Sequence, residues 1–429
     1  MWPLLSTLLL LSRVHHMSAS PPISNPSVRM QHVSYPNHPY NHVQSSRPVS
    51  RRLLSGTVNL NESTLDSQLQ SAIDDIWTNI RITPYFGYLD NTTGKTDAYT
   101  ANELKQRVSA AIRYYEQFVK VVHTDKPLRL KKTCSYIDGE KNCTTTCADT
   151  HFAIPAEHLD TGWIIDDKDD QCLVVDIDKP GWGVAETDLV IYVSNEDYRC
   201  AGRSWQTVCE QDQFGRPIAI WMNFCGVEYK EDDDNYKEQI DITLHELTHG
   251  LVFNSDYFSY FRDSTNGNSI PRDQVIDYID DAWWIVSPEV TRVAQDHFDC
   301  PQLPGARLAD AGYHWSGRML NTELMNNDGY YDYISKFTLA LMIDSGWYRI
   351  DDYSYAEPFY FGYLKGCAFI YDDCINRNHR YSNFPEFWCD SADDIGCYYD
   401  YSKTSSKCLY YDDYDSAKEH VPIEYQYFG

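Results

Sequence analysis

The sequence predicts an α+β fold, in which strands and long amphipathic helices pack around a common core. Three observations support this prediction: apolar residues at helical spacing over 101–120, short strand-like runs between residues 172 and 225, and a second helical pattern over 240–252. The chain has 429 residues, of which 42% are hydrophobic, so it can bury a sizeable core and form two or three domains.

The first 52 residues lack the pattern of a folded domain. A short apolar run at residues 2–11 is followed by Arg13 and by small residues at 18–20, which is typical of a secretory signal over residues 1–20. The run is too short to span a bilayer. Residues 21–52 are rich in Pro, Ser, Asn and His and end in two arginines, so we expect a propeptide with a basic processing site; the alternative is an arm that is never cut.

A helix and three strands are predicted next. Thr100 followed by Glu103 matches a capping box, and the apolar residues after it keep helical spacing over 101–120. Three β-branched and aromatic runs, bounded by Asp, Pro or Gly, predict strands at residues 172–177, 188–193 and 218–225.

The segment DITLHELTHGLV, residues 241–252, carries the strongest chemical signal. His245 and His249 lie four residues apart, so a helix projects both from one face, close enough to hold one metal ion. Neutral imidazole suits zinc, and Glu246 can take a proton from a water at the metal without binding the metal itself. A chance match on a helix is the weaker alternative, because His is rare.

Downstream of this motif the helical pattern continues in pieces. We expect helical segments at 281–285 and 288–297, and a later helix that includes Ile334 and Phe337 and stops at Gly346. Beyond residue 351 the chain is dense in Tyr, Asp and Cys, which is typical of a loop-rich region held by disulfides.

Charge and cysteine content limit the possible partners and the compartment. A formal net charge of −27 argues against nucleic acid and against anionic membrane surfaces. The 13 cysteines begin at Cys134 and form no CxxC pair, so we expect disulfides in an oxidising compartment. Sequons at Asn61, Asn91 and Asn142 agree with secretion, and no segment beyond the signal is expected to cross a membrane.

A catalytic zinc site needs three protein ligands, and the residues alone leave the third one open. A carboxylate on the next predicted helix is one possibility, and three downstream histidines are the others. The candidates are Glu289, His297, His314 and His379.

The motifs resemble a known family. An HExxH helix, a distant third histidine at His314 and a methionine turn at Met325 are features of metzincin zinc proteases. The long insertion before His314 is similar to that of the leishmanolysin family. Segments 213–225, 292–306, 314–325 and 362–369 also look like that family, and the resemblance covers roughly residues 100–370.

The resemblance implies a site and a domain plan. His245, His249 and His314 would bind one Zn²⁺, Glu246 would be the general base, and Met325 would form the apolar floor under the metal. The fold would be that of a metzincin, with a twisted mixed sheet, an active-site helix and a disulfide-rich C-terminal region. The expected units are an N-terminal catalytic subdomain (53–250), an inserted subdomain (251–313) and a C-terminal subdomain (314–429).

Two departures from the family pattern matter. Val252 stands where the compact metzincin signature has Gly, so the chain must extend the helix or turn differently after it. Residues 1–133 contain no cysteine, so latency cannot depend on a propeptide thiol of the family type.

We therefore expect a secreted zinc endopeptidase that cleaves proteins or peptides, with possible association with a cell surface. An extended substrate would pair with a sheet edge, for which we nominate residues 218–223. The alternative from another class is a catalytically inactive secreted or surface protein, used for binding or adhesion, on the same fold; the 34 tyrosines would suit such contacts.

Overall fold

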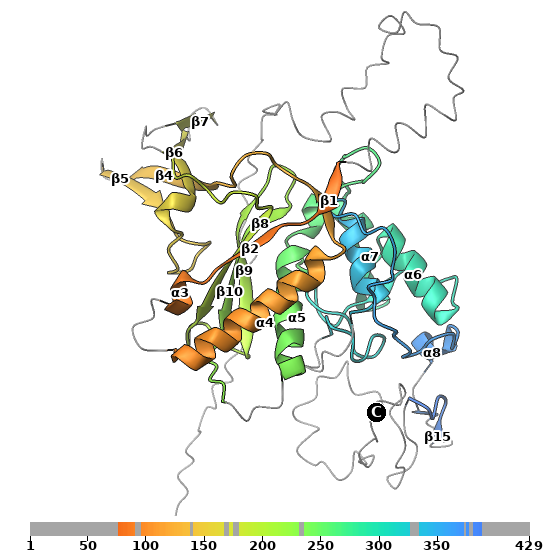
Figure 1. Cartoon of the computed structure of the whole chain (residues 1–429). Helices are drawn as coiled ribbons and strands as arrows, with labels where there is room; N and C mark the ends of the chain where they lie inside the picture. Colours follow the sequence, from red (N-terminus) through yellow and green to blue (C-terminus); the bar gives the residue numbers. More distant parts are fainter. Residues whose placement is uncertain are drawn as a thin grey trace, which may run out of the picture.

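The computed structural model describes residues 76–90, 96–137, 140–166, 171–174, 180–230, 236–326, 334–372, 375–376 and 381–387 (Figure 1). Several predictions lie outside these residues: the signal, the propeptide, the sequons at Asn61 and Asn91, and the candidate ligand His379.

A four-stranded sheet forms the centre of the first half of the molecule. Its order is β2 (Ile82–Tyr85), β8 (Leu189–Asn195), β10 (Pro217–Phe224) and β9 (Ser204–Gln211). Strands β2, β8 and β10 run parallel to one another, and β9 runs antiparallel to β10 at the edge. Every residue of β8 and β10 is buried, because these inner strands are covered on both faces. Their continuous apolar runs made the strands recognisable in the sequence.

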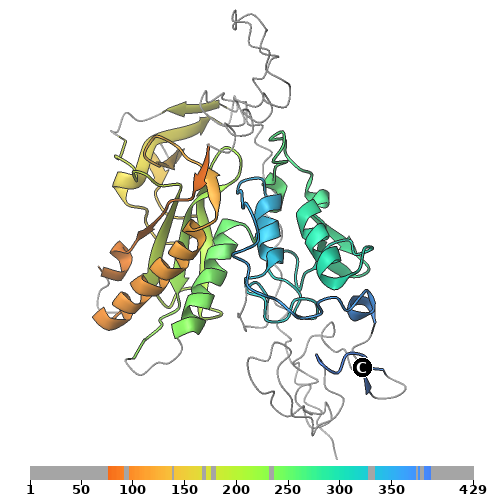
Figure 2. The ribbon, with the colours of Figure 1, turned by 45° about the vertical axis from the view of Figure 1, so that its right-hand side comes forward.

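Two helices cover one face of this sheet, α4 (Ala98–Glu116) and α5 (Tyr236–Leu251), and they pack against each other (Figures 1 and 2). The capping-box prediction for α4 was wrong. The helix begins three residues earlier than predicted, because the Asp97 side chain accepts hydrogen bonds from the backbone N–H groups of Tyr99 and Thr100. Tyr115 of α4 is fully buried and its hydroxyl hydrogen-bonds Thr248 of α5.

The opposite face of the sheet carries an aromatic cluster that includes Phe152, Tyr192 and Trp221. A second four-stranded sheet lies beside the first one. Its order is β5 (Glu140–Thr144), β4 (Leu130–Ile137), β6 (Leu159–Asp166) and β7 (Gln171–Val174). The structure is thus a mixed α and β fold, as predicted.

A second group of elements lies on the far side of α5 from α4 (Figure 2). It contains the helices α6 (Pro288–Phe298) and α7 (Lys336–Asp344), which pack together, and a three-stranded sheet of β11 (Ile276–Ile279), β12 (Ala282–Ile285) and β13 (Ala306–Arg307). The half-buried Asp344 at the end of α7 caps α6, because its carboxylate accepts from the backbone N–H groups of Glu289 and Val290.

The helical prediction for residues 281–285 was wrong, since residues 282–285 form strand β12. Asp280 and Asp281 both adopt positive φ, 47° and 59°, which suits a two-residue hairpin turn between β11 and β12. Trp283, Trp284 and Ile285 then follow as residues that favour strands. The prediction that the later helix stops at Gly346 agrees with the structure. Helix α7 has its C-cap at Ser345, and Gly346 follows directly with a φ of 70°.

The remaining elements are short. They are the strands β1 (Trp77–Asn79), β3 (Lys120–Val122), β14 (Ile375–Asn376) and β15 (Tyr381–Ser382), the helices α3 (Gly87–Asp90) and α8 (Ala368–Tyr371), and the 3-10 helices η1 (Ala156–His158), η2 (Phe258–Tyr260) and η3 (Arg272–Gln274).

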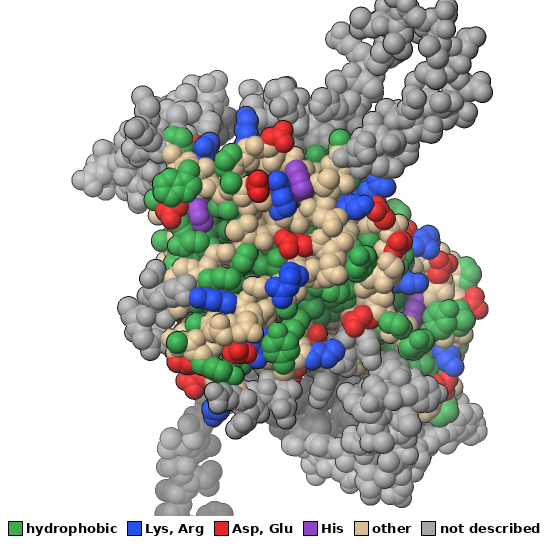
Figure 3. All heavy atoms as spheres, in the orientation of Figure 1, with side chains coloured by type: hydrophobic (Ala, Val, Ile, Leu, Met, Phe, Trp, Pro, Cys, Tyr) green, Lys and Arg blue, Asp and Glu red, His purple; other side chains and the backbone are tan. Residues whose placement is uncertain are grey.

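Three disulfides lie within the described residues: Cys147–Cys209, Cys200–Cys225 and Cys300–Cys367. The last one joins the end of α6 to the beginning of α8. In the same residues no helix is both long and apolar enough to cross a bilayer. On the face seen in Figure 3, acidic and basic side chains are interspersed, so the negative net charge forms no single large patch there.

Candidate metal centre

The C-terminal half of α5 is buried although it is rich in polar residues. His245, Glu246 and His249 are only 4%, 7% and 8% exposed. Burying such groups is costly unless they are hydrogen-bonded or bind a metal. Helical spacing places both histidines on one face, and their ring centroids lie 4.6 Å apart.

The protonation of the two rings follows from their partners. The Nδ1 atom of His245 lies 2.7 Å from the carbonyl oxygen of Leu324, and that of His249 lies 2.7 Å from the carbonyl oxygen of Phe253. A carbonyl oxygen only accepts, so each Nδ1 carries the proton. Burial also lowers the pKa of His245 well below its ordinary value and that of His249 to about 4. Both rings are therefore neutral at physiological pH, with the lone pair on Nε2.

The two Nε2 atoms lie only 3.0 Å apart. Two lone pairs that face each other at this distance repel, and a cation between them would satisfy both. Nitrogen ligands about 2.1 Å from a tetrahedral zinc ion are about 3.4 Å apart, so the observed spacing fits zinc with a small adjustment.

A third histidine joins this pair. The ring of His314 lies 5.4 Å from that of His245 and 4.9 Å from that of His249, measured between centroids. One nitrogen from each of the three rings can be chosen so that all lie within 4.8 Å of one another, a group that could hold a metal ion.

Asp310 orients the third histidine. Its Oδ2 lies 2.7 Å from the Nδ1 of His314, and its Oδ1 accepts from the backbone N–H groups of Gly312, Tyr313 and His314. These hydrogen bonds lower the pKa of Asp310 although burial opposes them. The charged carboxylate keeps the proton of His314 on Nδ1, which leaves Nε2 as the ligand atom.

The rival third ligands are placed elsewhere. Glu289 accepts from Arg292 and from the hydroxyl of Tyr353, and its pKa is lowered chiefly by Arg292. His297 hydrogen-bonds the carbonyl oxygen of Phe361 through Nε2. Neither belongs to the metal-holding group in the described residues.

Glu246 faces the edge strand of the sheet. Its Oε1 accepts a hydrogen bond of 2.8 Å from the hydroxyl of Ser204, the first residue of β9. Burial raises the pKa of Glu246 to about 7, and the serine opposes that shift. A carboxyl group poised near neutral pH suits a general base.

The turn around Met325 is tied to the rest of the centre. Met325 is fully buried, and its carbonyl oxygen accepts from the backbone N–H of Trp315, the residue after the third histidine. The buried carboxylate of Glu323 accepts from the Met325 N–H and from the hydroxyls of Ser335, the N-cap of α7, and Thr338 in its first turn. Burial raises the pKa of Glu323 to about 7.

The chain leaves α5 without a glycine. The helix ends at Leu251, and the N–H groups of both Val252 and Phe253 bond to the carbonyl oxygen of Thr248. Val252 keeps a negative φ, so of the two alternatives a different turn is the one that occurs. This turn presents the Phe253 carbonyl to His249.

The prediction that residues 218–223 form the sheet edge that pairs with a substrate was wrong. Residues 218–223 belong to β10, which pairs with β8 on one side and β9 on the other, so this strand has no free edge. An inner strand and an edge strand can have the same apolar pattern, and only the pairing distinguishes them. The edge strand beside α5 is β9.

Comparison with known proteins places this site in a family. The family model described as leishmanolysin matches residues 157–429, which include the whole metal centre. The chain belongs to the leishmanolysin family. This is a family of zinc metalloendopeptidases, so the resemblance stated from the sequence is confirmed.

Several relatives of the leishmanolysin family match over long stretches. A leishmanolysin-like peptidase of Drosophila pseudoobscura pseudoobscura is 29% identical over 325 residues, which is 63% of this chain and 47% of the relative. One from Caenorhabditis elegans is 26% identical over 393 residues, covering 80% and 56%. A leishmanolysin homolog of Crithidia fasciculata is 27% identical over 255 residues, covering 57% and 34%. The chain spans about half the length of the first two relatives.

Sequence reasoning missed Ser204, Asp310 and Glu323. Ser204 lies 42 residues before Glu246 and belongs to no motif. Asp310 lies four residues before His314 outside any helix, so its spacing carried no signal. Glu323 was visible only as the neighbour of the predicted methionine turn.

Replacing Asp310 tests its role at this leishmanolysin centre. Asp310→Asn removes the charge that holds the proton on Nδ1 of His314, and we expect zinc affinity to fall about 10- to 100-fold. Competition with a chromophoric chelator measures the affinity. Asp256→Asn, a change of the same kind on the exposed surface after α5, serves as the control. Equal zinc affinity in the Asp310 variant and the unsubstituted chain would contradict the role.

Proposed function

We propose that this protein is a secreted zinc-dependent endopeptidase. The observation that carries the proposal is the convergence of three histidines, His245, His249 and His314, beside the buried carboxylate of Glu246. The opposed lone pairs of the first two histidines favour a bound cation, and the family is one of zinc enzymes. Three disulfides in the described residues agree with an extracellular location.

Zinc bound by the three histidines would lower the pKa of a water molecule and polarise the scissile carbonyl group. Glu246 would take a proton from the attacking water as its oxygen bonds to the carbonyl carbon. It would then deliver that proton to the amide nitrogen as the C–N bond breaks, which releases the amine. The pKa of about 7 suits both the acceptance and the return of the proton.

An extended substrate would pair with the edge of β9. This strand packs beside α5, and Ser204 at its start hydrogen-bonds Glu246. Backbone hydrogen bonds from the edge would align a peptide across the centre whatever its side chains are.

The finer metzincin features belong to the same proposal. Met325 would form the apolar floor of the metal site, which its full burial and the adjacent Leu324–His245 hydrogen bond support. Residues 251–313 would form an inserted subdomain around α6 and the β11–β12–β13 sheet. The N-terminal and C-terminal subdomains at 53–250 and 314–429 would hold the site between them.

Metal removal tests the proposed activity. The purified chain should cleave an unstructured protein such as casein, and a zinc chelator should abolish the cleavage, because the three histidines without a metal ion cannot polarise the scissile carbonyl group. Adding back zinc should restore activity. Cleavage that persists after complete zinc removal would refute the proposal. Zinc binding without any cleavage, also after residues 1–52 are removed, would favour the inactive binding protein instead.

A further inference from the structure

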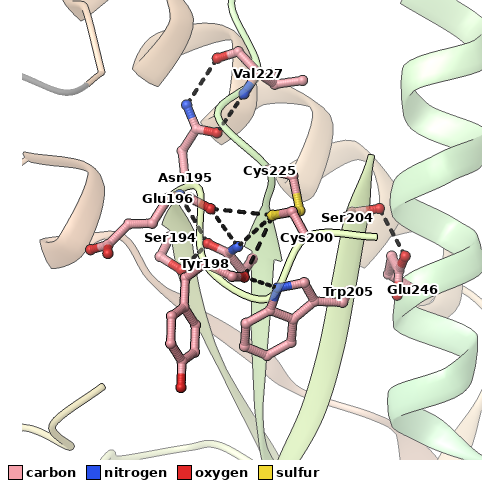
Figure 4. Close-up of a disulfide and its surroundings, with 11 residues drawn as sticks. Ser194, Asn195, Glu196, Tyr198, Cys200, Ser204, Trp205, Cys225, Val227 and Glu246 are labelled. Atoms are coloured by element: carbon pink, nitrogen blue, oxygen red, sulfur yellow. Dashed lines mark hydrogen bonds between the residues drawn. A yellow bond between two sulfur atoms is a disulfide. The ribbon is translucent and has the colours of Figure 1, made fainter. Parts of the chain in front are cut away.

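The contact between Ser204 and Glu246 connects the edge strand to the proposed base (Figure 4). The hydroxyl of Ser204 donates to Oε1 of Glu246 over 2.8 Å. Within the described part of the chain the carboxylate takes no other hydrogen bond. The second oxygen, Oε2, therefore keeps its lone pairs for a proton.

A buried carboxylate that acts as a base must be held in one orientation. Glu has three side-chain torsions, and a misplaced reacting group costs rate even when the rest of the site is intact. No residue of α5 hydrogen-bonds the carboxylate of Glu246. The serine on the neighbouring strand supplies that restraint from outside the helix.

Ser204 is itself held firmly. In the ladder it lies opposite Phe224, and the backbone N–H of Cys225 donates to the carbonyl oxygen of Arg203 over 3.0 Å. The disulfide between Cys200 and Cys225 then ties the loop before β9 to the end of β10 (Figure 4).

The same loop is anchored on its inner side. The buried Asn223 accepts from the hydroxyl of Ser194 and from the N–H of Glu196, and its amide donates to the Glu196 carbonyl oxygen. The indole N–H of Trp205 donates to the carbonyl oxygen of Tyr198 (Figure 4). The loop therefore enters β9 with its first residue at a fixed place.

We propose that Ser204 is a positioning residue for Glu246, and that the Cys200–Cys225 disulfide keeps Ser204 against the carboxylate. The inference rests on the proposed peptidase function. It assigns to the edge strand a second role besides substrate pairing, which is to orient the base.

The first test removes and restores the hydroxyl. Ser204→Ala should lower kcat on casein or a peptide substrate about 10- to 100-fold, the size expected for one hydrogen bond to a charged group, with KM unchanged. Ser204→Thr keeps the hydroxyl and should recover most of the activity. Zinc affinity, measured by chelator competition, should be the same in all these proteins, because the Ser204 hydroxyl hydrogen-bonds Glu246 and none of the three histidines.

The control removes a hydroxyl outside β9 and the metal centre. Ser259 is exposed in η2, so Ser259→Ala should leave kcat unchanged. Equal kcat for Ser204→Ala and the unsubstituted chain would overturn the proposal, and so would a loss of zinc affinity that matches the loss of activity. If the unsubstituted zinc-loaded chain cleaves nothing, the proposed function fails and this inference fails with it.

The second test concerns the disulfide. The double variant Cys200→Ala with Cys225→Ala should reproduce the kcat defect of Ser204→Ala while zinc affinity stays normal. The matched control removes Cys300–Cys367, which joins the end of α6 to the beginning of α8 and lies outside β9, and should leave kcat close to that of the unsubstituted chain. If both double variants keep full kcat, the role assigned to the Cys200–Cys225 disulfide is wrong.

Discussion

Glu246→Gln is expected to remove nearly all peptidase activity while zinc stays bound. The amide keeps the shape of the side chain and can still contact Ser204, but it cannot accept a proton from water. Loss of a general base typically lowers the rate about 10²- to 10⁴-fold. The three histidines that would hold the metal are unchanged, so metal analysis should find the same zinc content.

The matched control for this variant is Asp241→Asn. It replaces a carboxylate by an amide on the same helix, where the partly buried Asp241 pairs with the exposed Lys237. It should leave both activity and zinc content unaltered. Substantial cleavage by Glu246→Gln would show that another group accepts the proton, and loss of its zinc would show that Glu246 is a ligand.

His314→Ala is expected to have the largest effect on metal binding. It leaves two imidazoles where a catalytic zinc site needs three protein ligands. Loss of a group that hydrogen-bonds a ligand, such as Asp310, typically lowers metal affinity about 10- to 100-fold. Loss of the ligand His314 itself should lower zinc affinity by more than that. Activity should disappear with the metal. Equilibrium competition with a chelator gives the affinity directly.

The rival ligands provide the controls for this variant. His297→Ala and Glu289→Gln should keep zinc, because the structure pairs these side chains with Phe361 and with Arg292 and Tyr353. Normal zinc affinity in His314→Ala, together with its loss in either control variant, would reassign the third ligand.

The parts of the fold and of the metal centre that the sequence could predict are local ones. The HExxH motif and the helix that bears it depend on residues within a few turns, as does α6. The strands β8 and β10 were found because strands buried on both faces have long apolar runs. The mixed α and β class followed from these elements.

The errors arose where pairing decides the outcome. Strand β12 was predicted as helical, because a short apolar segment has no clear period until its hairpin partner is known. The nominated substrate edge proved to be an inner strand for the same reason. Sequence spacing also left the third ligand open, and the family resemblance, not the residues themselves, favoured His314.

The supporting groups could not be predicted at all. Ser204, Asp310 and Glu323 reach the centre from an edge strand, a loop and the methionine turn. Their roles depend on how distant segments meet, which no local pattern records. The different turn after α5 likewise appears only when the Phe253 carbonyl is placed beside His249.

The most direct test of the central claim is zinc content measured together with casein cleavage, on the purified chain and its Glu246→Gln variant. We predict one zinc ion per chain in both proteins, with chelator-sensitive cleavage by the unsubstituted chain alone. A chain that binds no zinc, or a variant that cleaves as well as the unsubstituted chain, would contradict the account.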